Sequence, residues 1–172
     1  MNQFFNLLIL IVGGGISLIA LFTVLKLLLP ASVDRARLNL EINIGRSLLL
    51  GVVNFLFFGA LSMFFFWLAQ LVGGVIAAIF IFLGGLIGLA LIILTLLGLV
   101  ALADLLGHRM GSGSTPLTTH LRGGLLLVLA GLAPFIGWFV FTPLALWTGL
   151  GATIQAFFRR KASEPAPEDA AD

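Results

Sequence analysis

The 172-residue chain has the length of one domain, and its composition excludes an ordinary soluble protein. Hydrophobic residues make up 60% of the chain and charged residues 9%, whereas a typical soluble domain carries about 25% charged residues. The formal net charge is only +2, and a chain without cysteine has no disulfide, thiolate metal site or cysteine nucleophile.

Three long runs of the chain carry no charged side chain: residues 2–25, 47–103 and 123–158. A soluble domain of this size has no core large enough to bury all of them. A helix needs about 20 apolar residues to cross a hydrocarbon core of about 30 Å. We therefore expect an all-α, polytopic membrane protein, with the lipid bilayer as its main partner.

The first run predicts one helix from Phe4 to Leu29, ended by Pro30. Lys26 lies near its end, where a lysine side chain can extend its ammonium group to the membrane interface. A cleavable signal peptide fits less well, because the first five residues carry no basic side chain and basic residues follow the run.

The segment of residues 32–44 separates the first two runs. At helical spacing Val33, Ala36, Leu40 and Ile44 share one face, which predicts an amphipathic helix lying in the membrane interface. The alternation of apolar residues also fits a strand, but the chain offers no partner strand, so we favour the helix.

The second run is long enough to cross the membrane twice. Its best turn is at Gln70–Gly74, where a polar side chain precedes two glycines that weaken a helix. We expect helices near residues 47–69 and 75–104, joined by a short turn. Three transmembrane helices thus precede the last run.

The third run is too long for one upright crossing and slightly short for two. Pro134 and Gly137 interrupt it near the middle, because proline removes a backbone donor and glycine loosens the helix. We expect a helical hairpin with its apex at Pro134, Gly137 and Trp138, and leave open whether it makes two short crossings or is re-entrant. Residues 1–161 then form a single transmembrane domain, and the Pro- and acid-rich residues 162–172 a disordered tail.

All lysine and arginine residues except Lys26, near the end of the first helix, lie in three segments between or after the predicted helices, and cytoplasmic loops carry an excess of such residues. This rule places the segments at 30–46, 104–122 and 159–172 in the cytoplasm and the N-terminus outside. An even number of passes between Arg122 and Arg159 is then required, as in a hairpin. The basic residues form no face that could follow a phosphate backbone, so we do not expect nucleic acid as a partner.

Three residues are candidates for a metal site: Asp104 and His108, four residues apart at the end of the third span, and His120 across the next loop. A carboxylate and two imidazoles suit a divalent metal. The sequence shows no metalloenzyme motif around them. We therefore interpret these residues as polar side chains at the point where the helix leaves the bilayer, and expect no metal.

The second span carries a stripe of small and polar residues that includes Gly51, Asn54 and Ser62. Small residues let helices approach closely and an amide can bond across their interface, so we expect helix packing. The alternative is a water path with Asn54 at its narrowest point. Gly84 and Gly88 have the GxxxG spacing of close helix contacts and predict packing between the second and third spans.

Ionisable side chains are missing from the interior of the predicted spans. Proton relays, ion-coupled transporters and voltage sensors require them there, and the same observation excludes haem ligation by a histidine in mid-membrane. The chain also lacks a Ser-His-Asp set, a glycine loop that cradles phosphate and a pair of carboxylates. We expect no catalytic residue, no cofactor and no enzymatic activity.

Short motifs give the chain a family resemblance. A basic segment leads into residues 45–51, a long hairpin ends at residues 107–109, and residues 122–124, 134–138 and 149–152 follow before the basic stop. Over residues 5–161 the chain resembles a small polytopic membrane domain of bacteria that occurs alone or fused to bactofilin-type polymer-forming domains. The resemblance implies the inner membrane, a membrane or cytoskeletal protein partner or a homo-oligomer, and no known reaction.

The leading hypothesis is therefore a non-enzymatic inner-membrane protein that serves as a membrane anchor or assembly partner. The alternative is a small channel or facilitator for a neutral or hydrophobic solute.

Overall fold

The computed structural model describes residues 2–110, 116–133 and 135–162. Every element in these ranges is helical: α1 (Asn2–Leu28), α2 (Pro30–Ile42), α3 (Ile44–Leu71), α4 (Gly74–Arg109), α5 (Pro116–Leu132), the π-helical turn η1 (Gly137–Phe141) and α6 (Thr142–Ala162). Four stretches are long and apolar enough to cross a membrane: Ile9–Leu28, Ile44–Leu71, Gly74–Arg109 and Gly137–Phe158. The predicted class of polytopic helical protein is confirmed.

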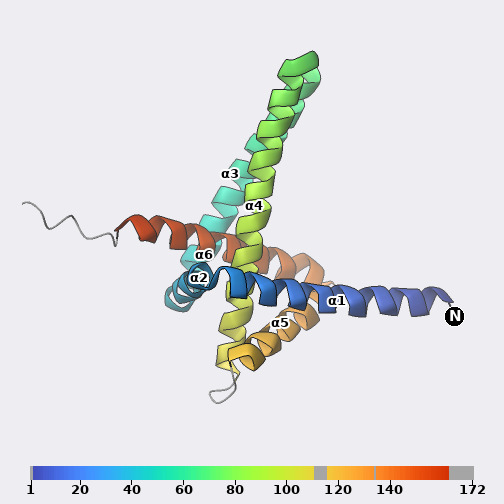
Figure 1. The fold of residues 1–172 in the computed structure, drawn as a ribbon, viewed down its shortest axis with the longest axis vertical. Coiled ribbons are helices and arrows are strands. Elements are labelled where there is room, and N and C mark those ends of the chain that lie inside the picture. Colours follow the sequence, from blue (N-terminus) through green and yellow to red (C-terminus); the bar gives the residue numbers. More distant parts are fainter. Residues whose placement is uncertain (1, 111–115, 134, 163–172) are drawn as a thin grey trace, which may run out of the picture.

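Helices α3 and α4 form one long antiparallel hairpin, and α1 and α6 run across it (Figure 1). Helix α6 contacts the hairpin at Gly51 on α3 and at Gly98 on α4. We call the part of the hairpin beyond these contacts, residues 52–71 and 74–97, the arm. The arm projects away from the other helices, although α6 still contacts its base, as between Phe55 and Trp147. The lower part of α4 lies among α1, α2, α5 and α6.

The turn of this hairpin lies where glycine allows it. Helix α3 ends at Leu71, and α4 begins at Gly74, whose φ of +66° falls in the left-handed region that side chains disfavour. The expected turn at Gln70–Gly74 is confirmed. The helices exceed the expected ones at both outer ends, so that Asp104 lies inside α4 and not at its end.

Helix α2 starts directly after α1, with Pro30 as its first residue, a position where a missing backbone donor costs little. Val33, Ala36 and Leu40 are buried as one face, but this face packs on α4 and α6 and is not left for lipid. The placement of Ile44 on that face is wrong. The extended backbone of Asn43 ends α2 and resets the helical register, so that Ile44 begins α3 and is half exposed.

Glycines bring α6 against the hairpin. A Cβ atom on Gly51 would collide with the carbonyl of Trp147, and one on Gly151 with the carbonyl of Ser47. Gly98 and Gly149 face each other in the same way between α4 and α6. The backbones approach so closely that no side chain fits between them, as is typical of helix contacts in membranes.

The two helices of the C-terminal hairpin differ in length. The apolar part of α5, Leu121–Leu132, is about 18 Å long at about 1.5 Å per residue, too short to cross the core of a bilayer. Helix α6 with η1 is long enough. Both contact η1, but α5 and α6 diverge from it and do not pack along each other over their described residues (Figure 1).

The apex of this hairpin is built at η1. Gly137 presses against the carbonyl of Ala130, and Phe135 has a positive φ of 63°. Trp138 points outward and is 69% exposed. Of the other predicted features, Pro134, the loop at 111–115 and the tail from residue 163 lie outside the described residues.

Replacement of Gly51 by alanine is expected to destabilise the protein, because the new methyl group has to displace the backbone of α6. Overpacking of this kind lowers the free energy of unfolding by about 1–3 kcal/mol, which corresponds to a Tm lower by about 2–10 °C. Thermal unfolding of the purified protein in detergent measures it. Gly59→Ala on the same helix is the matched control, since nothing lies within 4 Å of its added Cβ. Equal Tm values for both variants would contradict the contact.

Candidate functional site

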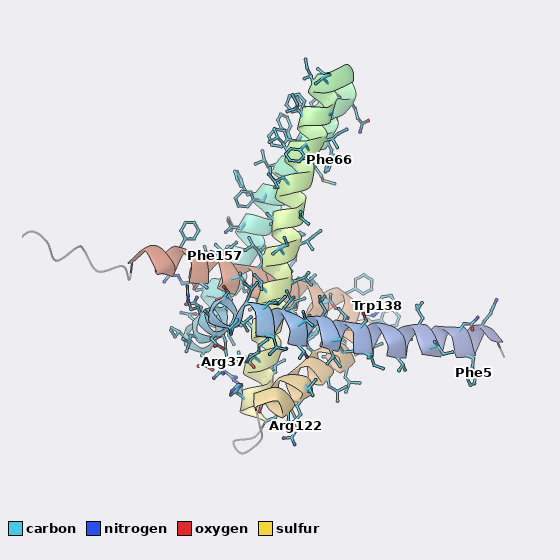
Figure 2. All side chains as sticks on the ribbon, viewed as in Figure 1. Phe5, Arg37, Phe66, Arg122, Trp138 and Phe157 are labelled. Atoms are coloured by element: carbon cyan, nitrogen blue, oxygen red, sulfur yellow. The ribbon has the colours of Figure 1, made fainter. Side chains whose placement is uncertain are left out.

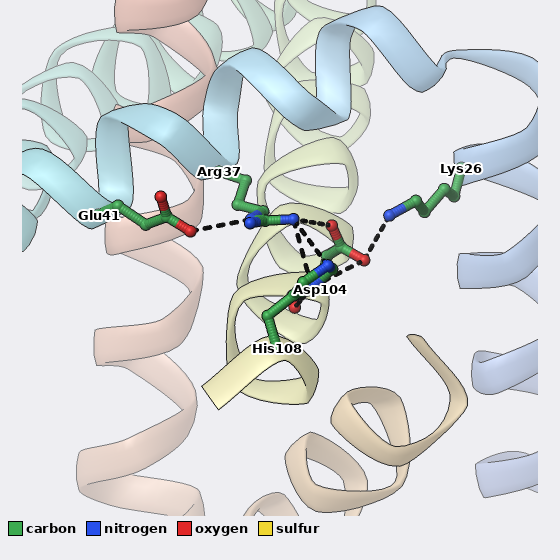
Figure 3. Close-up of polar contacts among 5 residues, drawn as sticks. All are labelled: Lys26, Arg37, Glu41, Asp104 and His108. Carbon is green, nitrogen blue, oxygen red and sulfur yellow. Dashed lines mark hydrogen bonds and ion pairs between the residues drawn. The ribbon is translucent and has the colours of Figure 1, made fainter. Parts of the chain in front are cut away.

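Five charged or titratable side chains from three helices meet in one cluster (Figure 3). Lys26 comes from the end of α1, Arg37 and Glu41 from α2, and Asp104 and His108 from α4. The residues are named together below as the ionic cluster.

The centre of the ionic cluster is Asp104, whose side chain is fully buried. Lys26 Nζ forms an ion pair with Asp104 Oδ1. Arg37 Nη1 lies 3.4 Å from Oδ2, and Arg37 Nε donates a hydrogen bond of 2.9 Å to Glu41 Oε1. Two cations therefore face two carboxylates, and the burial of Asp104 is compensated by charge on both of its oxygens.

His108 completes the ionic cluster. Its Nδ1 lies 2.8 Å from the carbonyl oxygen of Asp104, and its Nε2 lies 3.0 Å from Arg37 Nη1. Arg37 Nη1 also lies 3.2 Å from His108 Nδ1, so the guanidinium is close to both nitrogens of the ring. Burial lowers the pKa of Arg37, but the hydrogen bonds and charges of Glu41 and Asp104 outweigh burial and raise that pKa above its ordinary value. Arg37 stays charged.

Sequence reasoning missed this cluster. It expected Lys26 to extend to the membrane interface, but Lys26 is only 22% exposed and turns to Asp104, 78 positions along the chain. The pair Arg37 and Glu41 has the i,i+4 spacing of a helical ion pair, which was a usable signal. Nothing in the sequence pairs Lys26 with Asp104.

The ionic cluster is poorly suited to a metal ion. Both oxygens of Asp104 face cations, which would repel another one, and His108 uses Nδ1 on a backbone carbonyl. Within the described ranges no three side chains of His, Cys, Asp or Glu gather as ligands. The side chain of His120, the third candidate, lies outside the described residues.

The polar residues of α3 bond in different ways. Ser62 is buried and donates a hydrogen bond of 2.8 Å to the carbonyl of Gly84 on α4. Asn54 does not bond across an interface, since its amide donates to the carbonyl of Leu50 on its own helix, at 2.7 Å. Ser47 accepts a hydrogen bond of 3.1 Å from Gln155 on α6.

The two glycines of the GxxxG pattern lie against α3. A Cβ on Gly84 would be 3.1 Å from the carbonyl oxygen of Ser62, and one on Gly88 would be 3.6 Å from Ser62 Oγ. Gly84 is thus tightly packed, whereas Gly88 has room for a methyl group. A hydrogen bond between membrane helices contributes about 0.6 kcal/mol, less than a forced overlap costs, so glycine contacts dominate this interface.

These helices define the class of the protein. Several apolar helices of membrane-crossing length, most of whose large apolar side chains are exposed, fit an integral membrane protein of the multi-pass type. No protein-family model matches the chain, and neither a curated protein nor a solved structure is significantly similar to it.

Replacement of Asp104 by asparagine is expected to leave Lys26 and Arg37 with the partly exposed Glu41 as the one remaining carboxylate of the ionic cluster. Breaking a buried ion pair in this way costs about 3–5 kcal/mol, which corresponds to a Tm lower by about 10 °C. The double variant with Lys26→Met removes one charge of each sign and is expected to recover part of the loss. Arg109→Gln, at the exposed end of α4, is the control. A Tm of Asp104→Asn equal to that of the control would rule out a structural role for the ionic cluster.

Proposed function

We propose that the protein is a non-enzymatic membrane anchor or assembly protein. The observation that carries this proposal is the division between its polar and apolar side chains. The ionic cluster and the hydrogen bonds of Ser47, Ser62 and Gln155 join helices to each other. The arm, in contrast, exposes large apolar side chains along its length, such as Phe64, Trp67, Phe82 and Ile92. A surface of this kind suits contact with lipid or with other membrane helices.

The lengths of the helices support insertion at a tilt. At about 1.5 Å per residue α1 is about 40 Å long and α4 about 54 Å, both longer than a bilayer core of about 30 Å. Helices that cross each other as α1 and α4 do cannot both stand upright. A helix of 40 Å spans 30 Å when tilted by about 40°, within the range of membrane helices. At the same tilt α4 spans about 41 Å along the membrane normal, so one end of α4 extends beyond the core.

The placement of the charged side chains supports an orientation. Arg37 and Arg122 lie near the region where α1, α2, α4 and α5 meet, whereas Phe5, Phe66 and Trp138 lie on parts that extend away from it (Figure 2). One side of the molecule thus collects basic residues from two of the three charged segments. By the positive-inside rule this is the cytoplasmic side, with the N-terminus and the tip of the arm outside and the C-terminus inside.

The partner of such an anchor is proposed from the resemblance to bactofilin-associated membrane domains: a membrane or cytoskeletal protein of a bacterial inner membrane, or further copies of this chain. The channel alternative depends on Asn54 lining a path. The Asn54 side chain donates its hydrogen bond to a carbonyl of its own helix and does not depend on water in a pore for a partner. This bond favours the anchor over the channel.

Single cysteines introduced at positions 2, 72, 113 and 165 are expected to report this orientation, since the chain has no cysteine of its own. Positions 2 and 72 should react with an impermeant maleimide added to intact spheroplasts, and positions 113 and 165 only after lysis. Reaction of 113 or 165 in intact spheroplasts would overturn the orientation.

The anchor and the channel differ in transport. In liposomes the wild-type protein and Asn54→Leu are both expected to release glycerol at the rate of empty liposomes, measured by light scattering after osmotic shock. In cells, a photo-crosslinking residue at exposed Phe66 is expected to give an adduct of one discrete size. Flux through the wild type that Asn54→Leu abolishes would establish the channel instead.

A further inference from the structure

A groove runs along α3 beside the end of α6. Its first part is a hollow of about 370 Å³ whose lining includes Asn43, Arg46 and Gln155. Its second part, also about 370 Å³, is lined by residues that include Phe58, Leu91 and Leu94. Both parts share Asn54, Ile154 and Phe158, so they join into one groove.

One end of the groove is polar and cationic. Among the side chains that the structure describes, Arg46 is the only charged one in its lining, and no described carboxylate lies within ion-pair distance of Arg46. The same end lies at the start of α3, where Asn43 caps the helix by accepting from the backbone amide of Arg46. A guanidinium attracts an anion through its charge and its several N–H donors. Asn43 and Gln155 add neutral polar groups there.

The other end of the groove is apolar. Phe58, Leu91, Leu94 and Phe157 line it, and Asn54, bonded to its own helix, lies at the junction. From Arg46 to Phe58 the groove follows α3 for about 18 Å, close to the depth of one leaflet, which is about half of a 30 Å core. An anionic head and an apolar tail of this length describe a phospholipid.

We propose that this groove binds an anionic glycerophospholipid of the cytoplasmic leaflet, with the phosphate at Arg46 and an acyl chain along Phe58 and Leu94. The inference rests on the proposed insertion of α3 with its N-terminus at the cytoplasmic side, and is independent of the anchor role. Its chemistry separates it from general lipid contact, because in a zwitterionic headgroup a cationic group offsets the phosphate charge that Arg46 attracts.

Native mass spectrometry of the full-length protein in mild detergent tests the site. Phosphatidylglycerol is expected to bind more tightly than phosphatidylcholine with the same acyl chains. Arg46→Gln is expected to weaken phosphatidylglycerol binding about tenfold, the usual effect of losing a charge-assisted hydrogen bond. Phosphatidylcholine binding is expected to weaken less, because its choline ammonium already offsets the phosphate charge. Arg122→Gln is the matched control, because Arg122 is also exposed but lies on α5, apart from this end of α6 (Figure 2).

Two further measurements distinguish the lipid from a soluble anion. Leu94→Trp fills the apolar end and is expected to weaken both lipids, and glycerol phosphate without acyl chains is expected not to compete. Full competition by glycerol phosphate with no effect of Leu94→Trp would assign the site to a soluble anion. Equal binding of the two lipids, or equal losses in Arg46→Gln and Arg122→Gln, would overturn the proposal. If the lipid test fails while cysteine labelling of the Arg46→Gln variant is unchanged, the failure concerns the lipid site and not the proposed orientation.

Discussion

The close approach of the α6 backbone to α3 and α4 is the contact on which the rest of the structure depends. Gly149 and Gly151 on α6 meet Gly98 and Gly51 with no space for a side chain. Inside a bilayer there is no hydrophobic force between helices, so close packing has to supply the attraction. Because α6 crosses the hairpin at these two points, they determine where the arm begins and where α2 and α5 find a surface to cover.

The ionic cluster performs a second task, which is to join α1 and α2 to the lower part of α4. Its charges are balanced within the cluster, with Asp104 buried between Lys26 and Arg37. A buried ion pair contributes little net stability, but a buried charge without its partner is costly. The pair therefore favours the one arrangement of helices in which both partners meet. The glycine contacts bring the helices together, and the charges select which helices meet at the lower part of α4.

The surfaces left over have two characters. The arm and the outer face of α1 expose apolar side chains, which suit lipid or further membrane helices. The groove beside α6 combines Arg46 with an apolar floor and is suited to a charged lipid. Under the two proposals above, the protein would respond to the lipid composition of the membrane in which it assembles.

The sequence by itself determined which segments are helices and where they break. Uncharged runs, Pro30 and the glycines at 73 and 74 are local signals, and the cost of a charge or an unpaired amide in lipid acts on each segment separately. Only the tertiary structure decided that α1 and α6 cross the hairpin, that Lys26 meets Asp104, that Ile44 leaves the face of α2, and that Gly149 and Gly151 lie against Gly98 and Gly51. Crossing depends on which glycines coincide at a contact, and an ion pair depends on that crossing. Neither is encoded in the composition or spacing of a single segment.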